Sequence, residues 1–219
     1  MSDAIKTVLC FGDSNTHGYN PQDGTRFGRD IRWTGQLQHL LGDTYLIIEE
    51  GCNGRTTVHG DTTDGWINGM AYLRPCLYSH RPVDYVVLML GTNDLKACFR
   101  ATPEAIAEGM KTIVRETLEF MQEHQQKEPR IILIAPPVLG DGMSESVFSD
   151  EFTEESVRKS YALAGLYEEI AKRYRCVFLN ASDFVTVSEA DSLHLSADSH
   201  AKFADVLYDC ICNSEKENK

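Results

Sequence analysis

Five short apolar runs are spaced along the chain, and between them lie longer stretches whose apolar residues recur every three or four positions. Most of the short runs are almost continuously apolar, which is typical of parallel strands that helices cover on both faces. A repeat of three to four residues indicates helices with one buried face. The pattern therefore predicts five strands, at residues 7–11, 46–50, 85–90, 130–135 and 176–180.

Five helices are predicted between and after these strands, at residues 33–41, 65–80, 102–125, 156–173 and 197–213. The third has the clearest signals: Thr102 suits the N-cap, Pro103 the first helical position and Glu104 the positive end of the helix dipole. In the last helix, Ser196 is the expected cap. The buried stripe of the third helix is expected to contain Ile106, Met110, Ile113, Val114 and Met121.

The alternation of strands and helices predicts the α/β class, with an open parallel sheet between two layers of helices. A chain of 219 residues fits a single domain, residues 1–219, that is long enough to bury a hydrophobic core without disulfides or bound metals to stabilise it. The polar end, residues 214–219, is expected to fray. Residues 136–155 form a long connection that mixes glycine and acidic residues with apolar ones.

Charge narrows the classes of partner. The chain has a formal net charge of −12 and a sequence pI near 5.0. Such a surface repels phosphate backbones and anionic lipids, so we expect no nucleic-acid or membrane binding. No apolar run approaches the roughly 20 residues that span a bilayer, and the first residues show no signal-peptide pattern. The expected partner is a small-molecule substrate, and a homo-oligomer is an open alternative.

The chain has seven cysteines and no CxxC pair. Zinc binding therefore has little support, and no metal ligand is predicted from the sequence. Several cysteines lie in or beside apolar runs or in the last helical pattern. The sequence thus indicates reduced, mostly buried thiols in a cytoplasmic protein.

Polar, glycine-rich turns follow several of the predicted strands. Gly12-Asp13-Ser14-Asn15 follows the first, residues 51–56 follow the second, residues 91–94 follow the third, and residues 191–194 lie beyond the fifth. In an open parallel sheet the carboxyl ends of the strands meet at one rim, and ligands bind outside it. We therefore expect these turns to lie together and to form the functional site.

The turns contain the groups of a serine acyl-transfer site. The Ser14 hydroxyl needs a base to become a nucleophile, and the imidazole of His194 suits that task. Asp191, three residues earlier, can orient the ring and stabilise the imidazolium. The backbone N–H groups of Ser14 and Gly54 and the side-chain amide of Asn93 can donate to a developing oxyanion.

Each of these residues also has a purely structural interpretation. A serine after a strand often closes a turn or caps a helix, and Asn93 can form an Asx-turn. Gly54 can be present only because the backbone of its turn needs a positive φ. His200 competes with His194, but it falls inside the last predicted helix and no aspartate precedes it by three residues. The consistent order of all the pieces on one rim favours the catalytic interpretation.

The strings GDSN, GTND and DSLH, with the turn at Gly54, match the four sequence blocks of the SGNH, or GDSL-type, hydrolase family, from Gly12 to His194. RWTG (32–35), GRTT (54–57), MLGTNDLKACF (89–99) and APP (135–137) resemble a subgroup of small arylesterases and acyltransferases. The resemblance implies a flavodoxin-like three-layer α/β/α sandwich with five parallel strands. It also implies Ser14 as nucleophile, His194 as base, Asp191 as its orienter, oxyanion donors at Ser14, Gly54 and Asn93, and no cofactor.

Two residues beside the nucleophile depart from the family pattern. Asn15 stands where the family name has leucine, and His17 stands where acyltransferase-like members have an aromatic residue. Asn15, His17 and Trp33 are the expected substrate contacts, although helix-to-sheet packing is an equally good interpretation of Trp33. Further candidates for an apolar mouth are Phe27, Phe148 and Phe152.

The expected activity is hydrolysis of short-chain acetyl or aryl esters through an acyl-enzyme. Transfer of the acyl group to an alcohol or a peroxide is the alternative, since it differs only in the second nucleophile. A non-catalytic ligand-binding domain is a more remote alternative, because Ser14, Asp191 and His194 are all present. The first turn has neither GxGxxG nor GxxxxGK[ST], so nucleotide binding lacks its fingerprints.

Overall fold

The computed structural model describes residues 5–60, 67–125 and 128–216. Within them the strands form one parallel sheet in the order β2-β1-β3-β4-β5, which is the flavodoxin-like order. The strands are β1 (Lys6–Gly12), β2 (Tyr45–Gly51), β3 (Tyr85–Met89), β4 (Arg130–Ala135) and β5 (Val177–Asn180). The predicted α/β sandwich with a five-stranded parallel sheet is confirmed.

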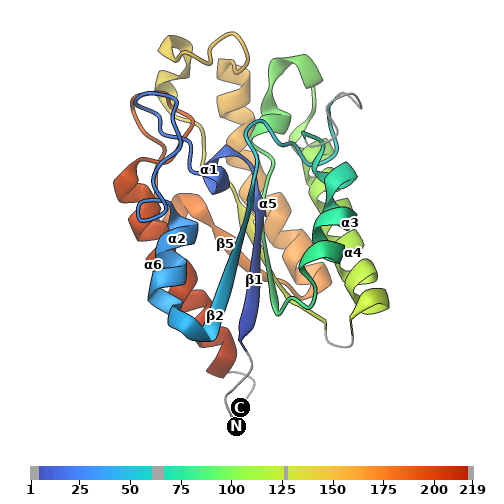
Figure 1. Cartoon of the computed structure of the whole chain (residues 1–219). Helices are drawn as coiled ribbons and strands as arrows, with labels where there is room; N and C mark the ends of the chain where they lie inside the picture. The colour runs from blue at the N-terminus through green and yellow to red at the C-terminus, as the bar shows by residue number, and fades with distance from the viewer. Residues whose placement is uncertain (1–4, 61–66, 126–127, 217–219) are drawn as a thin grey trace.

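Helices cover both faces of this sheet (Figure 1). One face carries α2 (Trp33–Leu41) and α6 (Ala197–Lys216), which pack against each other. The other face carries α3 (Gly69–His80), α4 (Pro103–His124) and α5 (Glu154–Tyr174). A single-turn helix, α1 (Ser14–His17), follows β1 directly.

The strand sequences explain why both faces are buried. Along β1, Leu9 and Phe11 belong to the core on the α3–α4–α5 face, while Val8 and Cys10 belong to the core on the α2–α6 face. Successive side chains of a strand point to opposite faces, so a continuous apolar run is needed where both faces are covered. β5 lies at one edge of the sheet and is only half-buried.

Helix α4 forms for the reasons that its sequence indicates. The Thr102 hydroxyl accepts a hydrogen bond from the backbone N–H of Ala105 at 3.2 Å, and Pro103 occupies the first turn. The predicted stripe is fully buried, from Ile106 to Met121. Likewise, the Ser196 hydroxyl accepts from the backbone N–H of Ser199 at 3.2 Å at the start of α6.

The C-terminal end differs from the expectation of a frayed tail from residue 214. Helix α6 continues to Lys216 because strand residues hold its last turn. The Tyr85 hydroxyl donates to the Glu215 carboxylate at 2.5 Å, and Lys6 pairs with the same carboxylate. Residues 217–219, and residues 65–66 of the predicted second helix, lie outside the described residues.

All seven cysteines are unpaired thiols. Their burial is lower than expected, since Cys10 and Cys76 are buried, Cys98 is exposed and the others are half-buried. Among the described residues, no helix is long and apolar enough to cross a bilayer.

Candidate active site

The strand order brings the predicted catalytic turns to one rim. β1 lies between β2 and β3, and Gly12, at the end of β1, pairs with Gly51 on one side and Met89 on the other. Along the chain, β2 is added on one side of β1, and β3, β4 and β5 are added on the other side. The point where the strand order reverses, between β1 and β3, is where open α/β sheets bind ligands. The turns after β1, β2 and β3 therefore lie side by side.

The turn that carries Ser14 is tightly packed. A Cβ at Gly12 would lie 2.1 Å from the Thr16 hydroxyl oxygen and 2.8 Å from the carbonyl oxygen of Met89, so only glycine fits there. The Asp13 carboxylate caps α1 by accepting from the backbone N–H of Asn15 at 2.9 Å. Ser14 thus begins a short helix directly at the strand end, as the sequence indicates.

Ser14, His194 and Asp191 form a continuous chain of hydrogen bonds. Nδ1 of His194 lies 2.6 Å from Oδ2 of Asp191, and Nε2 lies 2.9 Å from Oγ of Ser14. A carboxylate only accepts, so the ring proton belongs on Nδ1 and Nε2 is free to accept the serine proton. All three side chains are buried. The structure therefore joins the three residues that the sequence singles out.

Backbone groups fix the carboxylate in this chain. Oδ1 of Asp191 accepts from the backbone N–H groups of Leu193 and His194 at 3.0 and 2.9 Å. Burial works to raise the pKa of Asp191, but the hydrogen bonds and charge of His194 outweigh it, and the pKa lies below its ordinary value. Asp191 therefore stays ionised where it faces the imidazole.

A second buried carboxyl, that of Asp13, directly precedes Ser14. Burial raises the pKa of Asp13 to about 6, although the Asn15 N–H and the charge of His194 oppose the rise. Asp13 therefore keeps its proton to a higher pH than an exposed carboxyl group does.

Three N–H donors lie on the turns that follow β1, β2 and β3. The backbone N–H groups of Ser14 and Gly54 have no hydrogen-bond acceptor among the described residues. Gly54 has φ +78°, which its turn requires and which favours glycine. The amide of Asn93 donates one hydrogen to the carbonyl oxygen of Arg55 at 3.2 Å and has a second to offer. An oxyanion hole needs donors of this kind.

Asp94, which the sequence analysis did not single out, ties two of these turns together. Its fully buried carboxylate accepts from the backbone N–H of Thr57 at 2.9 Å and from the Thr57 hydroxyl at 2.5 Å. Nδ1 of His59 lies 2.8 Å from the same carboxylate, and this hydrogen bond raises the pKa of His59. Asp94 thus links the turn of Asn93 to the turn that begins at Gly54.

Asn15 and Trp33, two of the expected substrate contacts, bond to backbone atoms of the protein. Both are buried, at 1% and 0% exposure. The Asn15 amide donates to the carbonyl oxygen of Leu193 at 3.4 Å and accepts from the backbone N–H of Leu195 at 2.9 Å. Nε1 of Trp33 donates to the carbonyl oxygen of Asn15 at 3.0 Å, and its ring packs on Phe203. These side chains hold the Ser14 turn and the His194 loop in place.

Of the other residues expected to contact substrate or to line an apolar mouth, some lie beside His194 and some lie in the core. His17 is half-buried at the end of α1, where burial and then the charge of Arg26 lower its pKa. Phe27 packs edge-on against His200, and Phe152 is buried in the core. Phe148 lies at the site, with its ring 5.4 Å from that of His194.

Tyr19 is a site residue that the sequence reasoning missed. Its ring stacks on His194 with centroids 4.1 Å apart and meets Phe148 edge-on at 6.1 Å. In the sequence, the only indication of this position is that Tyr19 lies two residues after His17. The long connection that carries Phe148 is tied to the catalytic loop, since the Ser146 hydroxyl donates to the carbonyl oxygen of Asp191 at 2.5 Å.

His200 is separated from the chemistry. It is fully buried, and its Nδ1 accepts from the backbone N–H of Trp33 at 3.3 Å. Burial, with smaller contributions from the charges of Arg32 and His194, lowers the pKa of His200 to about 4. A histidine of this kind is neutral at physiological pH and forms part of the packing between α2 and α6.

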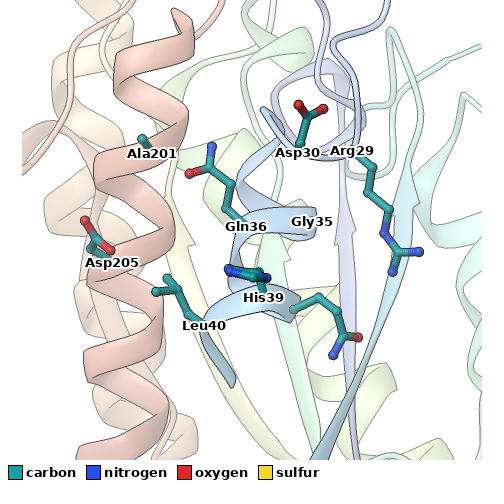
Figure 2. A pocket seen from close by; sticks show the side chains of 9 residues that line it. Arg29, Asp30, Gly35, Gln36, His39, Leu40, Ala201 and Asp205 are labelled. Atoms are coloured by element: carbon teal, nitrogen blue, oxygen red, sulfur yellow. The ribbon is translucent and has the colours of Figure 1, made fainter. Parts of the chain in front are cut away.

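A cavity of about 570 Å³ lies between α2 and α6, away from this rim. Figure 2 shows that its side chains come from α2, from the residues before it and from α6. It is lined by Arg29, Asp30, Gln36, His39, Leu40 and Asp205, among others. None of the residues that bond to Ser14 or His194 lines it, so it does not hold the acyl-transfer groups.

Comparison with known proteins identifies the family of this chain. The GDSL-like lipase/acylhydrolase family matches residues 10–202. No curated protein matches the chain significantly. Among solved structures, Est24, a carbohydrate acetylesterase from Sinorhizobium meliloti, is 37% identical over 95% of this chain and 99% of its own, with a TM-score of 0.88.

An aryl esterase from M. smegmatis is similarly close, with 35% identity, a TM-score of 0.88, and coverage of 95% of this chain and 99% of its own. A lipase/acylhydrolase from Enterococcus faecalis is only 20% identical, with a TM-score of 0.67 over 94% of this chain and 95% of its own. That third likeness supports the fold alone.

Proposed function

This chain belongs to the GDSL-like lipase/acylhydrolase family and is a serine esterase of the SGNH type, and we propose that Ser14, His194 and Asp191 are its catalytic residues. The proposal rests on one observation, the unbroken hydrogen-bond chain from the Ser14 hydroxyl through the His194 ring to the Asp191 carboxylate. A purely structural serine would not need a base oriented in this way.

In the first half of the reaction, Oγ of Ser14 attacks the ester carbonyl carbon and Nε2 of His194 takes the serine proton. Asp191 holds the ring through Nδ1 and stabilises its positive charge. The tetrahedral intermediate then collapses, the bond to the leaving alcohol breaks, and His194 returns the proton to that alcohol. The product of this half is an acyl group on Ser14.

In the second half, water attacks the acyl carbon while His194 again takes a proton. When the second intermediate collapses, the bond from the acyl carbon to Oγ of Ser14 breaks and His194 returns the proton to Oγ, which releases the carboxylic acid and restores the Ser14 hydroxyl. Both intermediates carry a negative oxygen. We propose that the N–H groups of Ser14 and Gly54 and the amide of Asn93 donate to it, because two of them have no other acceptor in the described structure. These steps need no metal or cofactor.

We propose short-chain acetyl or aryl esters as the substrates. Two close structural relatives are a carbohydrate acetylesterase and an aryl esterase. Tyr19 and Phe148 flank the His194 ring and are half-buried, so they offer apolar ring surface beside the reacting centre. The connection that carries Phe148 is fixed to the His194 loop, because the Ser146 hydroxyl donates to the carbonyl oxygen of Asp191 and the Gly140 N–H donates to that of Ser192.

A panel of p-nitrophenyl esters with increasing acyl length tests this choice. The expected result is a kcat/KM that is highest for acetyl and falls as the chain lengthens. A maximum at long chains would contradict the short-chain proposal. Labelling of the protein by a fluorophosphonate, with loss of labelling in Ser14→Ala, would separate an esterase from a ligand-binding domain.

Transfer of the acyl group to an alcohol or peroxide is the second candidate, and the position of Tyr19 favours it. Its ring covers one face of His194 at 4.1 Å, which makes the surroundings of the base apolar and disfavours water relative to an alcohol. Adding an alcohol to an ester assay and measuring the ratio of ester to acid formed tests this. Acid alone as the product, at every alcohol concentration, would exclude transfer.

We propose the cytoplasm as the compartment. All seven cysteines are unpaired, and one of them, Cys98, is exposed. Exposed free thiols persist in reducing compartments.

A further inference from the structure

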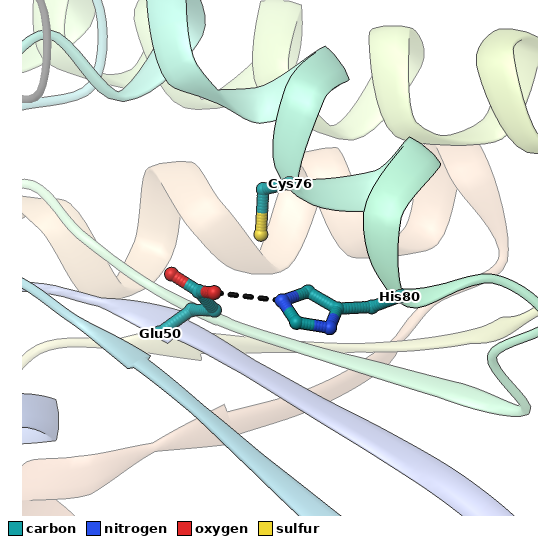
Figure 3. Close-up of side chains that lie close together, drawn as sticks. All are labelled: Glu50, Cys76 and His80. Carbon is teal, nitrogen blue, oxygen red and sulfur yellow. Dashed lines mark hydrogen bonds and ion pairs between the residues drawn. The ribbon is translucent and has the colours of Figure 1, made fainter.

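Three side chains that play no part in the ester chemistry converge between β2 and α3. Glu50 comes from the end of β2, and Cys76 and His80 come from successive turns of α3 (Figure 3). The Glu50 carboxylate oxygen, the Cys76 sulfur and a His80 ring nitrogen all lie within 4.8 Å of one another. Cys76 is buried, while Glu50 and His80 are half-buried.

We propose that Glu50, Cys76 and His80 form a binding site for a zinc ion. Thiolate, imidazole and carboxylate are the ligands that zinc takes in proteins, with bonds of about 2.0–2.3 Å. Because the three atoms lie within 4.8 Å of one another, small shifts of the side chains place all of them around one ion. The spacing of Cys76 and His80 explains their convergence, because residues four apart lie on the same face of a helix.

The ligand chemistry selects the cation. A thiolate and an imidazole bind borderline-soft metals such as zinc and cobalt in preference to magnesium or calcium, which take oxygen ligands. Nε2 of His80 lies 2.8 Å from Oε1 of Glu50, so these two groups already face each other. When the ring proton moves to Nδ1, Nε2 becomes a metal ligand. The half-buried positions of Glu50 and His80 leave an approach for a fourth ligand, a water.

Charge around the site is balanced when zinc is bound. Zinc binds sulfur as the thiolate, so the proton of the Cys76 thiol leaves to solvent when the ion enters. One thiolate and one carboxylate then offset the two charges of the ion. The positive charge of the nearby Arg55 guanidinium favours the thiolate. That guanidinium donates to the backbone carbonyls of Gly12 and Glu50 and lies over the rings of Phe11 and Tyr72.

This site departs from the sequence-based expectation of no metal. The sequence spacing of two residues that marks many zinc sites is missing here, because one ligand comes from a strand and two come from a helix. The site would link β2 to α3 and has no role in the acyl-transfer steps.

Cobalt titration of the chelator-treated full chain tests the proposal. One cobalt ion per chain should bind with the near-ultraviolet absorption of a cobalt–thiolate bond, zinc should displace it, and zinc should raise the Tm. His80→Gln and Glu50→Gln should each weaken cobalt binding at least tenfold, and Cys76→Ser should abolish the thiolate band. Controls are Cys98→Ser and His39→Gln, which remove an exposed thiol and an exposed imidazole and should leave band and affinity unchanged.

The proposal is overturned if the band survives in Cys76→Ser, or if it disappears in Cys98→Ser, because the metal then binds elsewhere on the surface. If Cys76→Ser fails to fold, His80→Gln and Glu50→Gln decide alone, since both positions are partly exposed. Wild-type affinity and an unchanged zinc effect on Tm in both of these variants would equally refute the site.

Discussion

The hydroxyl oxygen of Ser14 and Nε2 of His194 lie 2.9 Å apart, although 180 positions of sequence separate the two residues. Asn15 fixes the position of His194 relative to Ser14, because its side-chain amide forms hydrogen bonds with the backbone of Leu193 and of Leu195, on both sides of His194. The turn that carries Ser14 and the loop that carries His194 are therefore held together by the residue that directly follows Ser14.

The first prediction concerns Ser14→Ala. The variant should lose esterase activity on p-nitrophenyl acetate and labelling by a fluorophosphonate, because no other hydroxyl bonds to His194 in the described structure. Its circular dichroism and Tm should stay close to wild type. A small rate above the uncatalysed reaction is expected from the remaining donors. Near-wild-type activity would show that another residue is the nucleophile.

The second prediction separates the two histidines of the C-terminal part. His194→Ala should be nearly as damaging to kcat as Ser14→Ala, because triad residues act as a unit and their effects do not add. His200→Asn should keep most of the rate, since His200 bonds to the backbone of Trp33 and not to Ser14. Steady-state kinetics of the two variants decide, and the reverse ranking would refute the assignment.

The third prediction is a pH effect on stability. The pKa of His200 is lowered to about 4 in the folded chain by burial, against about 6.5 when unfolded. The unfolded chain therefore binds a proton first, and stability falls as pH drops from about 6.5 to about 4. The loss is about 3 kcal/mol, from about 1.4 kcal/mol per pH unit.

Comparison of wild type with His200→Asn isolates this effect. Asp13, whose pKa is raised to about 6, changes stability in the opposite sense over the same range, but it does so in both chains. Urea unfolding at pH 8 and at pH 4.5 should show a smaller loss of unfolding free energy in His200→Asn. Equal losses in the two chains would mean that His200 is not the titrating group.

The fourth prediction concerns the oxyanion donors. Asn93→Ala should lower kcat and kcat/KM together by about 10²–10³-fold, with KM little changed, because the donor acts mainly once charge has formed on the substrate oxygen. If the Asn93 amide only stabilises its turn, through its hydrogen bond to the Arg55 carbonyl oxygen, the same change lowers Tm and leaves the folded enzyme active. Measuring Tm and kcat on one preparation distinguishes the two outcomes.

The fifth prediction follows from the contacts of Asp94. Asp94→Asn keeps the shape but replaces an acceptor with a donor that faces the Thr57 N–H and the His59 ring. The two donor turns should shift relative to each other, and kcat should fall about tenfold to a hundredfold with little change in KM. His59→Gln removes one of the contacts and should have a smaller effect. An Asp94→Asn enzyme with full kcat would show that the link does not position the donors.

The fold could be predicted from sequence because its signals are local. The apolar runs and the caps at Thr102 and Ser196 each act within a few residues, and the structure has strands and helices where they indicate them. The end of α6 could not be predicted in the same way. Its last turn depends on Tyr85 and Lys6, which are distant in sequence.

The site shows the same division. The approach of Ser14 and His194 could be predicted, because both residues lie in turns that follow strands of one parallel sheet. The role of Asn15 could not be found, since its partners are backbone atoms of a loop far along the chain. Trp33 had two equal interpretations, and burial selects packing. The Tyr19 ring shows no pattern in sequence that reveals its stacking on His194.

The pairing of Lys6 with Glu215 has a practical consequence for handling the enzyme. Lys6 begins β1 and the catalytic rim lies where β1 ends, about 20 Å further along the strand. Coupling the protein to a resin or an electrode near these two residues therefore leaves the rim facing the liquid. An immobilised catalyst attached there receives its esters from the open side.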